Sequence, residues 1–224
     1  MKLRAAIFDF DGLILETEVA DFEAWGQVYR EHGAELTFAD WEVCIGTTNV
    51  FNPAEHLERL LGRPVDREAA RLKHRRLQDE VLARASLQPG VIDRLDEARA
   101  LGIKLAVASS AGGGWVDGHL RARGLLDRFD AVVVPDGRLE AKPGPDVYLE
   151  ALRLLGVGAG EAVAFEDSTN GIAAAKAAGI FTVAVPNALT ARLDLSKADL
   201  RAPSLAAVTL ADIDRRLANG GRGA

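Results

Sequence analysis

One pattern recurs through the second half of the chain: a helix-like spacing of apolar residues, then a glycine, then a short apolar run. In the first copy, apolar residues spaced three apart lead to Gly102, which can end a helix, and to a run that suits a buried strand. Gly156 and Gly179 mark two further copies. Apolar strands that alternate with helices predict an α/β fold with a Rossmann-like parallel sheet, covered on both faces. The runs predicted as strands are Leu3–Phe10, Ile103–Ala108, Ala131–Val134, Ala162–Phe165 and Phe181–Val185.

Residues 17–87 interrupt this alternation. Phe22, Trp25 and Tyr29 share one helical face, and the charged segment Arg67–Arg84 keeps a helical period without any β-branched run. About seventy residues of this kind are too many for a simple crossover between strands. We therefore expect a second, smaller, all-helical cap domain at 17–87, inserted after the first strand of an α/β core formed by 1–16 and 88–224.

The composition narrows the choice of partners and compartment. The 224 residues include 27 Lys and Arg against 33 Asp and Glu, a net charge of −6. Such a chain lacks the positive field that attracts nucleic acid or anionic lipid, so we expect neither nucleic acid nor a membrane as partner. Only four apolar residues stand directly before Asp9, which is too short a run for a signal peptide, and Cys44 is the single cysteine. A cytoplasmic location is expected, and the pattern sets no expectation for the oligomeric state.

Two carboxylates, Asp9 and Asp11, stand at the end of the first predicted strand, in the segment Ile7-Phe8-Asp9-Phe10-Asp11-Gly12. Ligands of parallel sheets bind beyond the carboxyl ends of the strands. Two carboxylates about 4 Å apart repel each other by about 4 kcal/mol at an effective dielectric constant of ~20, so a cation is expected to join them. The alternative is that one of them caps a helix and the other is solvated.

Three further strand ends carry polar residues. Ser109-Ser110 follows the second predicted strand of the core, Lys142-Pro143 lies beyond the third, and Glu166-Asp167-Ser168 ends the fourth. Hydroxyls and a lysine suit a phosphate, whereas carboxylates suit a hard cation such as Mg²⁺. Taken singly, Ser168 could be a helix cap, Lys142 a surface residue and Ser109 a turn residue. Taken together, they place one set of phosphate and metal ligands along a single edge of the sheet.

These segments resemble the four motifs of the haloacid dehalogenase superfamily, in order. The helical insertion resembles that of the branch that includes β-phosphoglucomutase and many small-molecule phosphatases. A residue other than Asp stands at the position of Asp11 in true dehalogenases, so dehalogenation is not expected. The matching segments are Phe8-Asp9-Phe10-Asp11-Gly12 with Thr17, Ala108-Ser109-Ser110, Lys142-Pro143-Gly144-Pro145-Asp146 and Phe165-Glu166-Asp167-Ser168.

The resemblance implies catalytic roles for the first motif. Asp9 would be the nucleophile that forms an aspartyl-phosphate. Asp11 would be the general acid that protonates the leaving oxygen and then the base that activates water. Gly12 would let the backbone turn sharply where the phosphate approaches.

The resemblance also implies a metal and a phosphate site. Mg²⁺ would be held by Asp9, the main-chain carbonyl of Asp11, Asp167 and Glu166. The Ser109 hydroxyl, the Ser110 amide and Lys142 would bind the phosphoryl oxygens of a small-molecule phosphate substrate.

The function expected from this resemblance is a Mg²⁺-dependent phosphatase that acts on a small organic phosphate monoester, such as a sugar phosphate. A phosphomutase and a non-catalytic phosphate-binding protein are the alternatives. The sugar-handling His and Arg of β-phosphoglucomutase fall on Asp21 and Asn49 in an ungapped register, which favours the phosphatase. Asp21, Thr48 and Asn49 are the candidate substrate contacts in the cap. Glu16 replaces the Asp that usually precedes Thr17 in the superfamily.

Other polar and aromatic features have ordinary interpretations. The four histidines show no metal-ligand spacing and are expected to be structural or exposed. The basic segment 71–76 is expected to be a solvated helix face rather than an anion site. Trp25 is expected in a core, although one of the rings on its helical face could reach the substrate, and Trp115 either packs or lines the mouth of the site.

Overall fold

The computed structural model describes residues 1–46 and 51–219. Its centre is a sheet with the strand order β3-β2-β1-β4-β5-β6, in which all neighbouring strands are parallel. This is the Rossmann-like order, so the predicted α/β fold class is confirmed. The strands are β1 (Ala5–Phe8), β2 (Lys104–Ala108), β3 (Ala131–Val133), β4 (Ala162–Glu166), β5 (Phe181–Ala184) and β6 (Leu200–Arg201).

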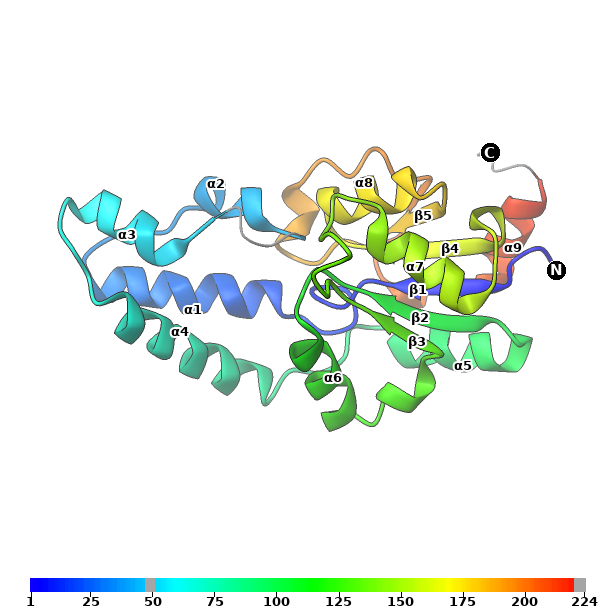
Figure 1. Cartoon of the computed structure of the whole chain (residues 1–224), viewed down its shortest axis with the longest axis horizontal. Helices are drawn as coiled ribbons and strands as arrows, with labels where there is room; N and C mark the ends of the chain where they lie inside the picture. The colour runs from blue at the N-terminus through cyan, green and yellow to red at the C-terminus, as the bar shows by residue number, and fades with distance from the viewer. Residues whose placement is uncertain (47–50, 220–224) are drawn as a thin grey trace.

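Helices cover both faces of this sheet (Figure 1). One apolar cluster joins Ala6 and Phe8 of β1 to side chains of three helices, α5 (Val91–Leu101), α6 (Gly113–Ala122) and α9 (Leu210–Ala218). The opposite cluster joins Ala5 and Ile7 to side chains of α7 (Asp146–Leu155) and α8 (Thr169–Ala177). Successive residues of β1 therefore face opposite layers, which explains why the whole strand is apolar.

Local signals set most element boundaries. Gly102 and Gly156 end α5 and α7 in the left-handed conformation, with φ of 67° and 64°, as the sequence predicts. The two-residue strand β6 was not predicted, because a segment that short carries no periodicity. The short 3₁₀ helices are η1 (Glu42–Cys44), η2 (Leu126–Arg128), η3 (Ala159–Glu161), η4 (Thr190–Arg192) and η5 (Leu205–Ala207).

The segment between β1 and α5 is helical and extends away from the sheet (Figure 1). Trp25, Tyr29 and other apolar residues of these helices form a cluster of their own, which Leu189 joins from the loop after β5. None of the helices among the described residues combines the length and apolar character needed to cross a lipid bilayer. The inserted helices are α1 (Glu18–Glu31), α2 (Phe38–Trp41), α3 (Pro53–Leu61) and α4 (Arg67–Leu82).

Candidate active site

The carboxyl ends of β1 and β4 meet at the centre of the sheet. The strand order reverses direction there, and ligands of such sheets bind in the crevice beyond this point. Asp9 follows β1, and Glu166 and Asp167 end and follow β4. All three are buried, and each has one carboxylate oxygen that lies within 4.8 Å of a carboxylate oxygen of the other two. The structure thus brings Asp9 and Asp167 together, as the strand-end argument predicts.

Lys142 lies between two of these carboxylates. Its Nζ atom is 2.5 Å from Oδ1 of Asp9 and 2.6 Å from Oε1 of Glu166, and its side chain is 1% exposed. Burial alone lowers the pKa of Lys142, but the Asp9 and Glu166 carboxylates outweigh burial, so that the pKa is raised. The side chain is therefore a buried ammonium and not a surface lysine.

Glu166 is held on both oxygens. Besides Lys142, the Tyr148 hydroxyl donates to Oε1 at 2.6 Å, and the Ser168 hydroxyl donates to Oε2 at 3.3 Å. The carboxylate occupies the space in front of Gly171, where a Cβ atom would lie 1.9 Å from Oε2. The Glu166 carboxylate therefore fixes the ammonium of Lys142. The role of Glu166 as a metal ligand stays a prediction.

Asp167 has a polar partner from the loop after β5. The amide of Asn187 donates to Oδ2 of Asp167 at 2.8 Å. Gly12 has a φ of +79°, and a Cβ atom there would lie 2.3 Å from the same oxygen. The tight contact observed at Gly12 is therefore with a buried carboxylate, and its contact with a phosphate stays a prediction.

Asp11 is positioned by three donors. The Thr17 hydroxyl and the Trp115 indole N–H donate to Oδ1 at 2.8 Å and 2.9 Å, and the Ser109 hydroxyl donates to Oδ2 at 3.4 Å. Burial raises the pKa of Asp11, and the hydrogen bonds from Trp115 and Thr17 lower it in part, so that the pKa stays above its ordinary value. Of the two interpretations of Trp115, the structure supports its place in the site.

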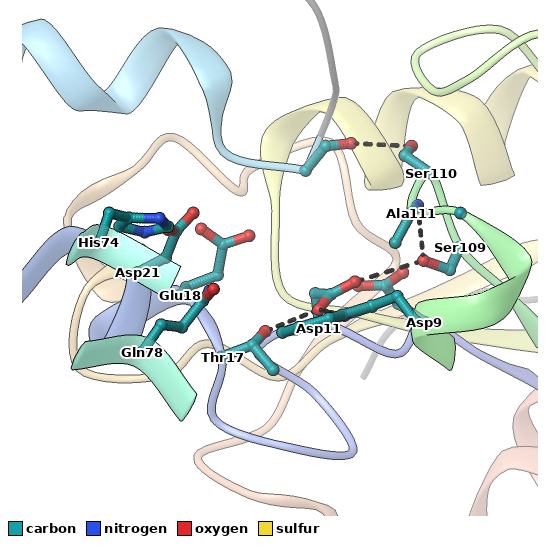
Figure 2. Close-up of a pocket in the computed structure, with 13 residues that line it drawn as sticks. Asp9, Asp11, Thr17, Glu18, Asp21, His74, Gln78, Ser109, Ser110 and Ala111 are labelled. Carbon is teal, nitrogen blue, oxygen red and sulfur yellow. Dashed lines mark hydrogen bonds and ion pairs between the residues drawn. The ribbon is translucent and has the colours of Figure 1, made fainter. Parts of the chain in front are cut away.

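These groups open into a cavity of about 310 Å³. Figure 2 shows the residues of the sheet edge on one side of it and residues of the inserted helices on the other. Lys142, Glu166 and Asp167 lie next to Asp9 but are not among the described residues that line the cavity. The lining residues from the sheet edge are Asp9, Asp11, Ser109, Ser110, Ala111, Gly112 and Trp115, and those from the inserted segment include Thr17, Glu18, Asp21, His74 and Gln78.

Both predicted serines are part of the cavity wall, with their hydroxyls engaged. The Ala111 amide donates to Oγ of Ser109 at 3.0 Å, and the Lys142 amide donates to Oγ of Ser110 at 3.1 Å. The hydroxyl of Ser110 donates to the carbonyl of Gly46 at 3.3 Å. The hydrogen bond from Ser110 to Gly46 connects the sheet edge to the inserted segment.

The predicted cap residues have different outcomes. Asp21 lines the cavity, where its Oδ1 pairs with Nε2 of His74. Thr48 and Asn49 lie outside the described residues. Glu16 accepts hydrogen bonds from the Val19 amide at 3.3 Å and from the Gln88 side chain at 2.8 Å, so the longer side chain links the two connections to the inserted segment.

Several residues of this region were not predicted from the sequence. Asn187 follows β5 as Asp167 follows β4, so the same strand-end rule could have found it. Tyr148 belongs to an apolar helical pattern, which gives no sign that its hydroxyl donates to Glu166. Glu18 and His74 carried no signal in the sequence, because their place at the cavity depends on how α1 and α4 pack.

The charges of the buried cluster suit a divalent cation. Asp9, Glu166 and Asp167 supply three carboxylates, against the one ammonium of Lys142. Burial raises the pKa of Asp167, and the carboxylates of Asp9 and Glu166 raise it further. Oxygen ligands of this kind are those that Mg²⁺ prefers, and a charge of +2 balances the excess. The residues present therefore fit a magnesium ion.

The chain is similar to known proteins over most of its length. The model of the haloacid dehalogenase-like hydrolase family matches residues 6–185. YhcW of Bacillus subtilis (strain 168) is 41% identical over 93% of this chain and 95% of its own length. The phosphorylated carbohydrates phosphatase of Thermotoga maritima is 31% identical over 80% of this chain and 82% of its own. The crystal structure of CbbY from Rhodobacter sphaeroides in complex with phosphate has a TM-score of 0.74 at 30% identity, covering 95% of this chain and 99% of that one.

Proposed function

The chain belongs to the haloacid dehalogenase-like hydrolase family, and on that basis we propose that it is a Mg²⁺-dependent phosphatase of small organic phosphate monoesters, such as sugar phosphates. The observation that carries the proposal is the position of Asp9. This carboxylate lies at the wall of the cavity, is paired on its buried side with Lys142, and has Asp11 as a second carboxyl group on the same wall. The similarity to a phosphatase of phosphorylated carbohydrates supports the substrate class.

In the first step, a carboxylate oxygen of Asp9 attacks the phosphorus atom of the ester. The bond between phosphorus and the alcohol oxygen breaks, and Asp11 gives its proton to that oxygen. The products are the free alcohol and an aspartyl-phosphate on Asp9. Thr17 and Trp115 orient Asp11 for this transfer through their hydrogen bonds.

In the second step, Asp11 acts as a base. It accepts a proton from a water molecule, whose oxygen attacks the phosphorus atom and releases inorganic phosphate and the Asp9 carboxylate. Lys142, the Ser109 hydroxyl and the Ser110 amide would stabilise the charge on the phosphoryl oxygens in both steps. We propose that Asp9, Asp167, Glu166 and the main-chain carbonyl of Asp11 hold Mg²⁺, which when bound supplies positive charge next to the transferred group.

Residues 17–87 are proposed to act as a cap over this site. Glu18, Asp21, His74 and Gln78 of this segment line the cavity opposite Asp9, a position from which they can contact the alcohol part of the substrate (Figure 2). A cap of this kind excludes bulk water during the reaction.

The test is a screen for released orthophosphate with a panel of phosphate monoesters, in Mg²⁺ and in excess EDTA. We expect release from at least one sugar phosphate in Mg²⁺ and none in EDTA. Conversion of a sugar phosphate to its isomer, dependent on a bisphosphate primer, would instead identify a mutase. Binding of phosphate esters without any turnover would overturn the enzymatic proposal.

A further inference from the structure

A second cavity of about 410 Å³ adjoins the first. Both cavities are lined by Glu18, Asp21 and His74, so these three side chains form the boundary between them. The described residues that line the second cavity all come from the segment between β1 and α5, and the proposed reaction uses none of those that it does not share with the first cavity. A substrate whose phosphate is at Asp9 and whose alcohol part is long enough would extend past the boundary into this space.

The boundary presents carboxyl groups. The Asp21 carboxylate is held by Nε2 of His74, and the His74 ring stacks on Trp25 with the ring centroids 4.5 Å apart. The side chain of Glu18 makes no hydrogen bond with any residue that the structure describes. Carboxyl oxygens at this point suit the hydroxyl groups of a sugar, and they oppose the passage of a second phosphate group.

Trp41 provides a hydrogen-bond donor in the second cavity. The residue lines the cavity and is 3% exposed, yet its indole N–H has no acceptor among the described residues. A buried donor without an acceptor costs about 1–3 kcal/mol, so such groups are rare and call for an explanation. The N–H is closed off from solvent, so a ligand oxygen in this cavity would reach it and supply the acceptor only after the surrounding side chains shift.

The rest of the second cavity combines aromatic surface and positive charge. The rings of Trp41 and Phe51 meet edge to face with their centroids 6.1 Å apart, and both residues line the cavity. Arg71 and Arg75, one helical turn apart on α4, bring guanidinium groups, which only donate hydrogen bonds. Aromatic rings and hydrogen-bond donors that line one cavity suit a ring that carries oxygen acceptors.

We infer that the second cavity is a subsite for a second ring on the alcohol part of the substrate, which is then a phosphorylated sugar joined to a further sugar or to a planar base. The sugar next to the phosphate has its hydroxyls at Glu18 and Asp21, and the second ring has its oxygen atoms at Trp41 and Arg71. This inference rests on the proposed phosphatase activity, since it extends the same substrate away from Asp9.

The first experiment compares kcat/KM for four esters: glucose 6-phosphate with one ring, trehalose 6-phosphate and uridine 5′-monophosphate with two, and fructose 1,6-bisphosphate with a second phosphate. We expect one of the two-ring esters to exceed glucose 6-phosphate by about tenfold or more, and the identity of that ester separates a saccharide from a base. Hydrolysis in which glucose 6-phosphate or the bisphosphate is the best of the four overturns the subsite but not the phosphatase. No release from any ester overturns both.

The second experiment locates the effect with Trp41→Phe, which keeps an aromatic ring and removes the N–H, and with Arg71→Ala. Each is expected to raise KM for the preferred two-ring ester about fivefold and to leave kcat/KM for glucose 6-phosphate unchanged. Arg76→Ala is the matched control, because Arg76 lies on the same helix, pairs with Glu80 and lines a different cavity. Equal losses on one-ring and two-ring esters would mean a general structural effect and would overturn the inference. Arg71 is exposed, so its variant keeps the test valid if Trp41→Phe fails to fold.

Discussion

Oδ1 of Asp9 lies 2.5 Å from Nζ of Lys142, a residue 133 positions further along the chain. Both side chains are almost fully buried. One oxygen of the proposed nucleophile is thus fixed by a buried cation, while the residue still lines the cavity in which the phosphorus atom would lie. Breaking a buried ion pair on one side is costly, so the pair also ties the end of β1 to the segment before α7.

Asp9→Asn tests the nucleophile directly. The amide has nearly the same volume and can still accept a hydrogen bond from Lys142, so a cooperative thermal unfolding transition is expected to persist. Phosphate release is expected to fall at least ~10³-fold, because the attacking carboxylate oxygen is lost. Asp93→Asn, at an exposed position in the first turn of α5, serves as the control and should keep full activity. Release at the wild-type rate by Asp9→Asn would refute the assignment.

Trp115→Phe tests the positioning of Asp11. The substitution removes the 2.9 Å hydrogen bond from the indole to Oδ1 and keeps an aromatic ring against His119. Hydrogen bonds to charged groups are worth about 1.5–3 kcal/mol, and Thr17 still holds the same oxygen, so we expect kcat to fall about tenfold with little change in KM. Thr17→Val removes the other donor to this atom and should act similarly. If neither variant lowers kcat, these hydrogen bonds do not orient the acid.

Gly12→Ala tests the contact between the first and fourth motifs. Gly12 and Gly33 have similar positive φ angles of 79° and 81°, but only Gly12 faces atoms that a Cβ would meet. Both alanine variants carry the backbone strain, and only Gly12→Ala displaces the Asp167 carboxylate. Overpacking of this kind costs about 1–3 kcal/mol, so the free energy of unfolding in urea should fall by that much more in Gly12→Ala than in Gly33→Ala. Equal losses would argue against the close approach.

Addition of Mg²⁺ tests the metal site without an activity assay. An ion that binds only the folded protein stabilises it by about 2.7 kcal/mol at a concentration of 100 Kd, so the thermal unfolding midpoint should rise with Mg²⁺. Asp167→Asn should weaken this rise, whereas Asp127→Asn, an exposed residue outside the carboxylate cluster, should not. NaCl at equal ionic strength provides the salt control. A midpoint that responds equally to both salts would count against the site.

The pH dependence of stability tests the packing of His119. Its ring meets the Trp115 ring edge to face, with the ring centroids 4.2 Å apart. Burial and the charge of Arg123 lower the pKa of His119. The carboxylates of Asp11 and Asp79 act in the opposite direction but do not outweigh them. The folded protein therefore favours the neutral ring. The stabilisation from this ring is present above the unfolded pKa of about 6.5 and is lost as the pH falls below it.

His119→Gln removes this titration. Between about pH 5 and 7, the free energy of unfolding should rise less with pH in the variant than in the wild type. The carboxyl groups of the site titrate in both proteins, so the difference between the two curves isolates the ring. Parallel curves would show that the ring is as well solvated in the folded protein as in the unfolded one.

Much of the fold could be predicted because its signals are local. The spacing of apolar residues that marks a strand or a helix is set by residues close together in the sequence. A glycine such as Gly102 ends a helix through its own backbone freedom. The same holds for Asp9 and Asp11, since a polar residue directly after a buried strand must lie at an end of the sheet. The division into core and cap also came from a change of period along the chain, and it stays a prediction.

The partners of these residues were decided by the tertiary structure. Trp115 donates to Asp11, and Asn187 donates to Asp167, because the strand order places their loops beside the centre of the sheet. The periodicity of a strand reports which face is buried but not which strand lies next to it. Contacts between side chains from separate strands and from the inserted helices depend on that order and on helix packing, so they could be known only once the chain was folded.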